Sequence, residues 1–127
     1  MMYSPESLRK QMSEGHIFCL AYDEKLLEYA GFISFEHNYN KQPKTKIHKL
    51  YVLPSYQGVG LGKLLMEVVE TETINQNNNI ITLNMNRYNR ALFFYKFLGF
   101  MIAGSEDIDI GNGYVMNDYI LEKDLTV

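Results

Sequence analysis

The 127-residue sequence has no tryptophan and a single cysteine, Cys19. A lone cysteine cannot form an intramolecular disulfide, and Cys19 lies in an apolar run, so we interpret it as a small buried hydrophobe rather than a nucleophile. No apolar stretch approaches the roughly 20 residues that a membrane span needs, and the first ten residues lack the apolar centre of a signal peptide. These absences favour a cytoplasmic protein that does not enter a membrane.

The sequence also has fewer basic than acidic residues. Twelve Lys and Arg stand against 15 Asp and Glu, which gives a net charge of -3. Binding to a phosphate backbone needs a basic excess, so nucleic acid is a poor candidate partner. The chain has 10 Tyr and 7 Phe, which argues against disorder, and its length suits one domain over residues 1–127 with one core.

Hydrophobic periodicity predicts an alternation of strands and helices. A proline just after Ser4 predicts a short first helix that ends near Gly15. Apolar residues at helical spacing predict a second helix after Gly62, which the polar run 75–79 ends, and a third that Gly99 closes. Runs rich in aromatic and branched residues predict strands at 17–22, 27–36, 46–53, 80–85, 101–110 and 114–123.

This order predicts an α/β fold with a mixed sheet (α+β) and helices on its faces. The strand, helix, strand unit over residues 46–85 favours a parallel crossover. Asp107, Asp109 and Gly111 resemble the start of a calcium loop, but Asn112 stands where that loop needs glycine and the flanks alternate as strands do. We therefore predict a β-hairpin there and no metal.

Residues 57–63 form a glycine-rich turn between a predicted strand and a predicted helix. The unpaired amides of a helix N-terminus favour an anion, and Lys63 adds a positive charge. A turn that merely connects two elements is the alternative. A P-loop would need glycine at Gln57 and Ser or Thr at Leu64, and a dinucleotide fingerprint that starts at Gly58 would need a small residue at Lys63. Neither pattern fits.

What fits is Gln57-x-x-Gly60-x-Gly62, which resembles the acetyl-CoA signature of the GNAT N-acetyltransferase superfamily. The approach to the turn matches as well, through Val52, Pro54 and Tyr56. Downstream, residues 89–100 are similar to the family's Asn-x-x-Ala-x-x-Phe-Tyr-x-x-x-Gly-Phe segment. The resemblance covers residues 17–125.

The resemblance implies transfer of an acetyl group from acetyl-CoA to a primary amine of a small molecule or peptide. Backbone groups of Leu50, Tyr51 and Val52 would hold the pantetheine arm, and Gln57 belongs to the signature. Asn89 would bind the arm near the thioester, with Tyr95 facing the sulfur. The pyrophosphate would lie on the amides of Gly58, Val59, Gly60, Leu61, Gly62 and Lys63.

Acyl transfer to an amine also needs an acid for the thiolate and a base for the ammonium. Tyr95 can supply the acid through its hydroxyl, although its place on an apolar helix stripe also fits a core aromatic. His48 is the candidate base, and strict alternation places it on the face of Lys46, Leu50 and Val52. Some GNAT enzymes use a histidine at this strand position, whereas others have a carboxylate where this chain has Lys46. A structural histidine is the alternative.

GNAT proteins usually begin with a strand and a helix before the helix that starts at Ser4, so we expect a longer native form, which intact-mass analysis would test. Without that strand, residues 17–22 would form a bare sheet edge, which predicts a homodimer. A non-catalytic acyl-CoA-binding domain with an incomplete acceptor site is the alternative function.

Overall fold

The computed structural model describes residues 15–111 and 113–126, so the first predicted helix lies outside the described residues. The other predicted elements are all present, with ends within two residues of the prediction. The helices are α2 (Leu61–Asn75) and α3 (Ala91–Phe97), and short 3-10 turns are η1 (Tyr39–Lys41) and η2 (Pro54–Tyr56). The strands are β1 (Ile17–Asp23), β2 (Glu28–Glu36), β3 (Lys44–Val52), β4 (Ile80–Asn86), β5 (Met101–Gly111) and β6 (Tyr114–Asp124).

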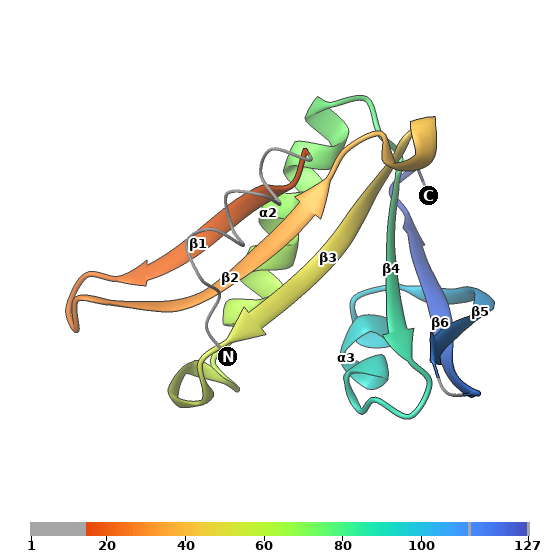
Figure 1. Ribbon diagram of the computed structural model, residues 1–127. Helices are drawn as coiled ribbons and strands as arrows, with labels where there is room; N and C mark the ends of the chain where they lie inside the picture. The colour runs from red at the N-terminus through yellow and green to blue at the C-terminus, as the bar shows by residue number, and fades with distance from the viewer. Residues whose placement is uncertain (1–14, 112, 127) are drawn as a thin grey trace.

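The six strands form one mixed sheet in the order β1-β2-β3-β4-β6-β5 (Figure 1). β3 and β4 are parallel and are joined through α2, which confirms the predicted crossover. All other neighbouring strands are antiparallel, including β5 and β6, which confirms the hairpin predicted in place of a calcium loop. No helix within the described ranges is long and apolar enough to cross a membrane.

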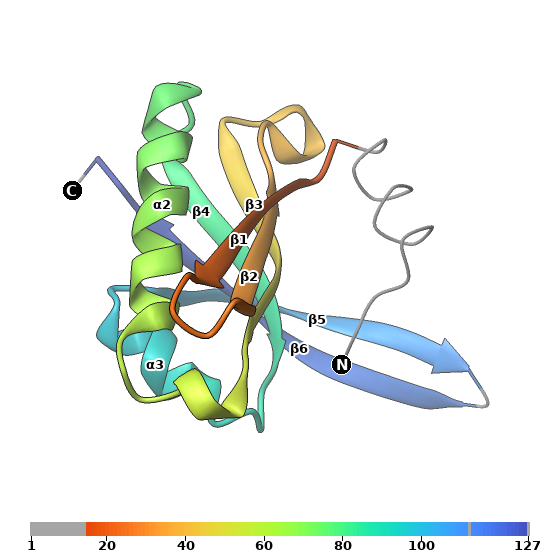
Figure 2. The same cartoon turned by 90° about the vertical axis from the view of Figure 1, so that its left-hand side faces the viewer.

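Helices α2 and α3 lie on the same side of the sheet (Figure 2). The main core fills the space between them and the sheet, because the apolar faces of both helices turn inward. Cys19 is partly buried and packs against this core, as a small hydrophobe would. The core residues are Ile33, Phe35, Ile47, Leu65, Met66, Val69, Ile81, Leu83, Met85, Tyr95, Phe100 and Leu121.

The sheet opens between β3 and β4. The two strands pair only from Lys44 with Ile80 to Ile47 with Leu83. Beyond this point β3 continues beside β2 and β4 continues beside β6, and the two strands diverge (Figure 1). A V-shaped split therefore lies at the carboxyl ends of the parallel pair, where ligands bind in many open α/β sheets.

A β-bulge lies on β3 at His48. Phe35 pairs with Ile47 and Ser34 pairs with Lys49, so His48 is the extra residue that has no partner on β2. The bulge reverses the alternation that follows it. Leu50 packs against the core on the helix side, whereas His48 contacts Glu36 on the opposite face. The expectation that His48 shares a face with Leu50 and Val52 is therefore wrong, because strict alternation does not survive a bulge.

Candidate active site

The turn before α2 holds its shape through glycines in the left-handed region. Gly58 has φ of 81° and Gly60, the N-cap of α2, has φ of 85°, values that other residues rarely adopt. The first backbone bond of the helix runs from the Leu64 amide to the Gly60 carbonyl at 3.1 Å. The amides of residues 61–63 precede it and have no carbonyl one turn back to bind. They are the free donors of an anion site.

Gly62 serves a different purpose from the other two glycines. A β-carbon there would lie 3.3 Å from Cζ of Phe94, so the glycine lets α3 approach the start of α2 closely. At Gly58 and Gly60 a β-carbon would meet nothing within 4 Å, and the positive φ is what requires glycine. The alternating glycines thus reflect two turn conformations and one helix contact.

A groove of about 610 Å³ lies in front of this turn. One wall comes from the end of β3, the second from the turn and the first residues of α2, and the third from α3. The groove brings together most of the residues predicted for cofactor binding. Its lining contains Leu50, Val52, Gln57, Gly58, Gly60, Leu61, Gly62, Lys63 and Tyr95, with Tyr56, Ala91, Phe94, Phe97 and Leu98.

Three other predicted cofactor residues have their side chains elsewhere. The ring of Tyr51 lies 6.1 Å from that of Phe32, and Val59 is largely exposed beside a different hollow. The Asn89 side chain accepts a hydrogen bond from the Ala91 amide, the first of α3, at 2.9 Å. Gln57 is held in place as well, since its amide donates to the Val52 carbonyl at 3.1 Å.

Tyr95 lies at the floor of the groove. Its side chain is 9% exposed, and its ring packs edge to face on Phe94 and Phe100, with centroids 5.3 and 5.6 Å away. Burial raises the pKa of Tyr95, because the charged phenolate loses hydration there. The hydroxyl therefore stays protonated at neutral pH and can act as a proton donor. Tyr95 is thus both a core aromatic and a groove residue.

His48 lies beside the split, on the face of the sheet opposite α2. Its Nε2 is 2.8 Å from Oε1 of Glu36, and its ring stacks on that of His16 with centroids 4.0 Å apart. Burial lowers the pKa of His48, and the charges of His16 and Lys46 lower it further, whereas Glu36 raises it. The net direction is downward, so the ring is neutral at pH 7 and can accept a proton.

Glu36 and His16 were not predicted as site residues. They lie on β2 and just before β1, far from His48 in sequence, and only the pairing register of the three segments places them together. Glu36, a charged residue that directly follows the mostly apolar stretch 29–35, was the one available signal. Lys46, which stands where some GNAT enzymes have a carboxylate, donates to Asn84 at 2.9 Å and lies over the ring of Tyr39.

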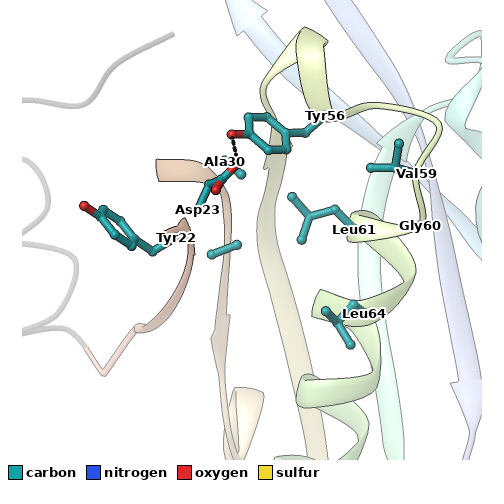
Figure 3. Close-up of a pocket in the computed structure, with 9 residues that line it drawn as sticks. Tyr22, Asp23, Ala30, Tyr56, Val59, Gly60, Leu61 and Leu64 are labelled. Atoms are coloured by element: carbon teal, nitrogen blue, oxygen red, sulfur yellow. Dashed lines mark hydrogen bonds between the residues drawn. The ribbon is translucent and has the colours of Figure 1, made fainter. Parts of the chain in front are cut away.

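A second, smaller hollow lies on the other side of the glycine turn (Figure 3). It has a volume of about 290 Å³ and separates the tip of the β1–β2 hairpin from the start of α2. Its polar edge is Tyr56, whose hydroxyl donates to Oδ2 of Asp23 at 2.5 Å. The lining is otherwise mostly apolar, with Val59, Leu61 and Leu64 on the turn and helix side. This hollow lacks the convergent donors of the groove.

The chain belongs to the GNAT acetyltransferase family. The family model described as acetyltransferase (GNAT) domain matches residues 1–122. An uncharacterized N-acetyltransferase of Mycobacterium tuberculosis is 29% identical over 110 residues, which are 86% of this chain and 67% of that protein.

Solved structures agree with this assignment. An N-acetyltransferase of Thermoplasma acidophilum in complex with coenzyme A has a TM-score of 0.68 and 27% identity, over 94% of this chain and 67% of that one. An aminoglycoside 6'-N-acetyltransferase complexed with coenzyme A has a TM-score of 0.74 and 21% identity, over 97% of this chain and 82% of that one. The fold predicted from the glycine turn and the segment 89–100 is thereby confirmed.

Proposed function

We propose that the protein is an N-acetyltransferase that moves an acetyl group from acetyl-CoA to a primary amine of a small molecule or peptide. The observation that carries the proposal is the groove, which joins the free amides at the start of α2 to Tyr95 and to the part of β3 that has no β4 partner. A long ligand with a phosphate at one end and a reactive carbonyl at the other fits this arrangement. Coenzyme A in the structures of similar fold supports the same ligand.

In this proposal the pyrophosphate lies on the amides of residues 58–63, with Lys63 as a mobile counter-charge. The pantetheine arm lies along the part of β3 that has no β4 partner, so the backbone of residues 50–52 is free to bind it on that side. The side-chain oxygen of Asn89 accepts from the Ala91 amide, which leaves its amide group to donate to the arm. The thioester then reaches the split next to Tyr95.

The acceptor amine is proposed to approach from the opposite face of the sheet. His48 is the first β3 residue past the last β3–β4 pair, and 22% of its side chain is exposed there. It accepts a proton from the ammonium, the neutral amine attacks the thioester carbon, and Tyr95 protonates the departing thiolate. Positioned proton transfer of this kind is typically worth about 10² to 10⁴-fold in rate.

Calorimetry with CoA followed by thiol-release assays with acetyl-CoA tests the proposal. We expect CoA to bind and thiol to appear only with some members of a panel of primary amines that includes aminoglycosides and peptides with free N-termini. A matched panel in which each amine is already acetylated is the control. Absence of CoA binding would refute the proposed function.

The alternative of a non-catalytic acyl-CoA-binding module shares the groove but not the chemistry. It predicts CoA binding together with no thiol release above the hydrolytic background for any amine. The Tyr95 hydroxyl in the groove and the polar cluster at His48 favour the enzyme, since a module that only binds has no need of either.

We further propose a homodimer formed through β1. In the described part of the sheet β1 pairs with β2 alone, and Leu20 and Tyr22 of β1 are exposed, as is Tyr29 of β2, which pairs with Tyr22. Such an edge favours pairing with a second chain. Light scattering should give twice the chain mass for the wild type and a monomer for Leu20→Lys, and a monomeric wild type would exclude the dimer.

A further inference from the structure

The strongest unassigned feature is the contact between His16, Glu36 and His48. The imidazole rings of the two histidines are stacked with centroids 4.0 Å apart and planes 11° from parallel. Both Nε2 atoms face the same oxygen, Oε1 of Glu36, at 3.6 Å from His16 and 2.8 Å from His48. All three side chains are partly buried, with 16 to 27% exposed.

We propose that His16, Glu36 and His48 form one proton-accepting unit, in which Glu36 and His16 are positioning residues that make Nδ1 of His48 the base. This inference rests on the proposed acetyl transfer and extends it to two residues that lie outside the cofactor groove.

Glu36 fixes the tautomer of His48. A neutral imidazole has one N–H and one acceptor nitrogen, and the carboxylate can only accept, so the N–H must lie on Nε2 at the 2.8 Å contact. Nδ1 is then the nitrogen that is left to take a proton. When it does, the new positive charge forms 2.8 Å from a carboxylate oxygen, which favours the imidazolium.

His16 holds the ring from one face and limits how much charge the unit can take. Two stacked imidazolium ions would repel each other, so the pair accommodates one positive charge far better than two. The Nδ1 atom of His16 is buried and has no hydrogen-bond partner in the described part of the chain, which further disfavours a second proton at this site.

Lys46 and Tyr39 also face His48. Lys46, two residues earlier on β3, lowers the pKa of His48, as do burial and the charge of His16. Tyr39 meets the His48 ring edge to face, with ring centroids 6.3 Å apart. Glu36 is the one group whose contact raises the pKa. The balance keeps His48 unprotonated until the ammonium arrives.

The protons balance over one turnover. The ammonium loses two protons in becoming an amide, and the thioester becomes a thiol. One proton passes to Nδ1 of His48 and is later released to water. The second proton leaves the nitrogen for water after the attack, and Tyr95 gives its own proton to the departing thiolate, which becomes the thiol. Water returns the proton to Tyr95.

The same three donors lie within 4.8 Å of one another, close enough for a metal ion to be considered. The ring orientation does not suit one. A metal lies close to the plane of each imidazole that binds it, and the planes of two rings stacked 4.0 Å apart and 11° from parallel do not meet within bonding distance of both rings. Metal-bound histidines also usually donate their second nitrogen to an acceptor, and Nδ1 of His16 has none among the described residues.

Two variants with opposite expected effects test the unit. Glu36→Gln removes the group that raises the pKa of His48, so the acid limb of the kcat/KM profile should move to lower pH, with a plateau at least about tenfold lower because the ring is no longer oriented. His16→Phe keeps a stacked ring without its charge, so the acid limb should move to higher pH. The KM for acetyl-CoA should stay unchanged in both variants. His37→Gln, which alters a histidine bonded to Thr45, is the control and should move neither limb.

NMR titration of His48 in the same variants separates this inference from the proposed function, since it needs no turnover. Opposite shifts of the His48 pKa in Glu36→Gln and His16→Phe support the unit even if no amine is acetylated. Shifts in the same direction, or none, refute it. All profiles are measured with and without a chelator, and loss of activity on chelation would overturn the proposal in favour of a metal site.

Discussion

The hydroxyl of Tyr56 donates to Oδ2 of Asp23 at 2.5 Å, which ties the turn before α2 to the tip of the β1–β2 hairpin. A second carboxylate, that of Glu28, lies 2.9 Å from the same hydroxyl. The hydrogen bond from Tyr56 is the main reason that the pKa of the Asp23 carboxyl is below its usual range, and backbone amides of the hairpin add to the effect. The two carboxylates also raise the pKa of Tyr56.

Replacing Tyr56 with Phe should return the Asp23 pKa toward its ordinary value of about 3.9. A carboxyl whose pKa is lowered by folding stabilises the protein above its unfolded pKa, and this contribution is lost as the pH falls through the folded pKa. Tyr56→Phe should therefore unfold at a higher pH on acid titration. Carboxyl NMR of Asp23 and acid denaturation measure the two effects. Tyr29→Phe, which removes an exposed hydroxyl from β2, should change neither.

Asn78 joins three segments that meet behind the start of β4. Its side-chain oxygen accepts from the Asn38 amide at 2.9 Å and from the Thr45 hydroxyl at 3.3 Å. Its amide group donates to the Asn38 side chain at 2.9 Å and to the Gln76 carbonyl at 3.0 Å. Only 3% of the residue is exposed, so water cannot replace these partners.

Asn78→Ala should lower the free energy of unfolding by roughly 3 kcal/mol, because each buried group left without a partner costs about 1 to 3 kcal/mol. Denaturant titration measures the loss. The neighbouring Asn79→Ala is the matched control, since Asn79 is exposed and its backbone bonds to Pro43 and Leu125 remain. An equal loss in both variants would show that the hydrogen bonds of Asn78 are not the cause.

The sequence predicted the elements well and their cross-strand details poorly. The asparagine-rich run 75–79 was correctly interpreted as the end of a helix, because polar residues break the apolar periodicity. That one of these asparagines is buried at a junction depends on Asn38 and Thr45, which lie more than 30 positions away. The pattern of neighbouring residues in the sequence gives no information on hydrogen bonds between such distant positions.

The same limit applies at the candidate site. The glycine turn could be predicted because its position between a strand and a helix fixes its geometry, whereas Tyr95 was named from the resemblance of residues 89–100 to a family segment. The expectation that His48 shares a face with Leu50 and Val52 was wrong, since a one-residue bulge leaves no mark in the hydrophobic alternation of a short strand. Its partners Glu36 and His16 follow from the register of β1, β2 and β3, which sequence alone does not give.

Gly31 allows β2 to lie close to the end of β3. A β-carbon at this position would be 2.4 Å from the Tyr51 carbonyl oxygen, and a backbone atom held in a sheet cannot move aside as a side chain can. Gly31→Ala should destabilise the protein by about 1 to 3 kcal/mol and weaken CoA binding, because Gly31 pairs with Val52 of the groove. Thermal denaturation and calorimetry measure both effects. Gly104→Ala, where a β-carbon meets nothing closer than 3.9 Å, should have little effect on either.

Tyr95→Phe separates chemistry from binding. The ring keeps its contacts with Phe94 and Phe100, so stability and CoA affinity should be nearly unchanged. Loss of the hydroxyl removes the proton for the thiolate and should slow the chemical step about 10² to 10⁴-fold in single-turnover assays. Because burial raises the pKa of Tyr95, the wild-type rate should show no alkaline fall from this residue below pH of about 10. Tyr88→Phe alters a tyrosine that is 84% exposed and is the control. An undiminished rate in Tyr95→Phe would assign the proton to another group and leave Tyr95 a packing residue of the groove floor.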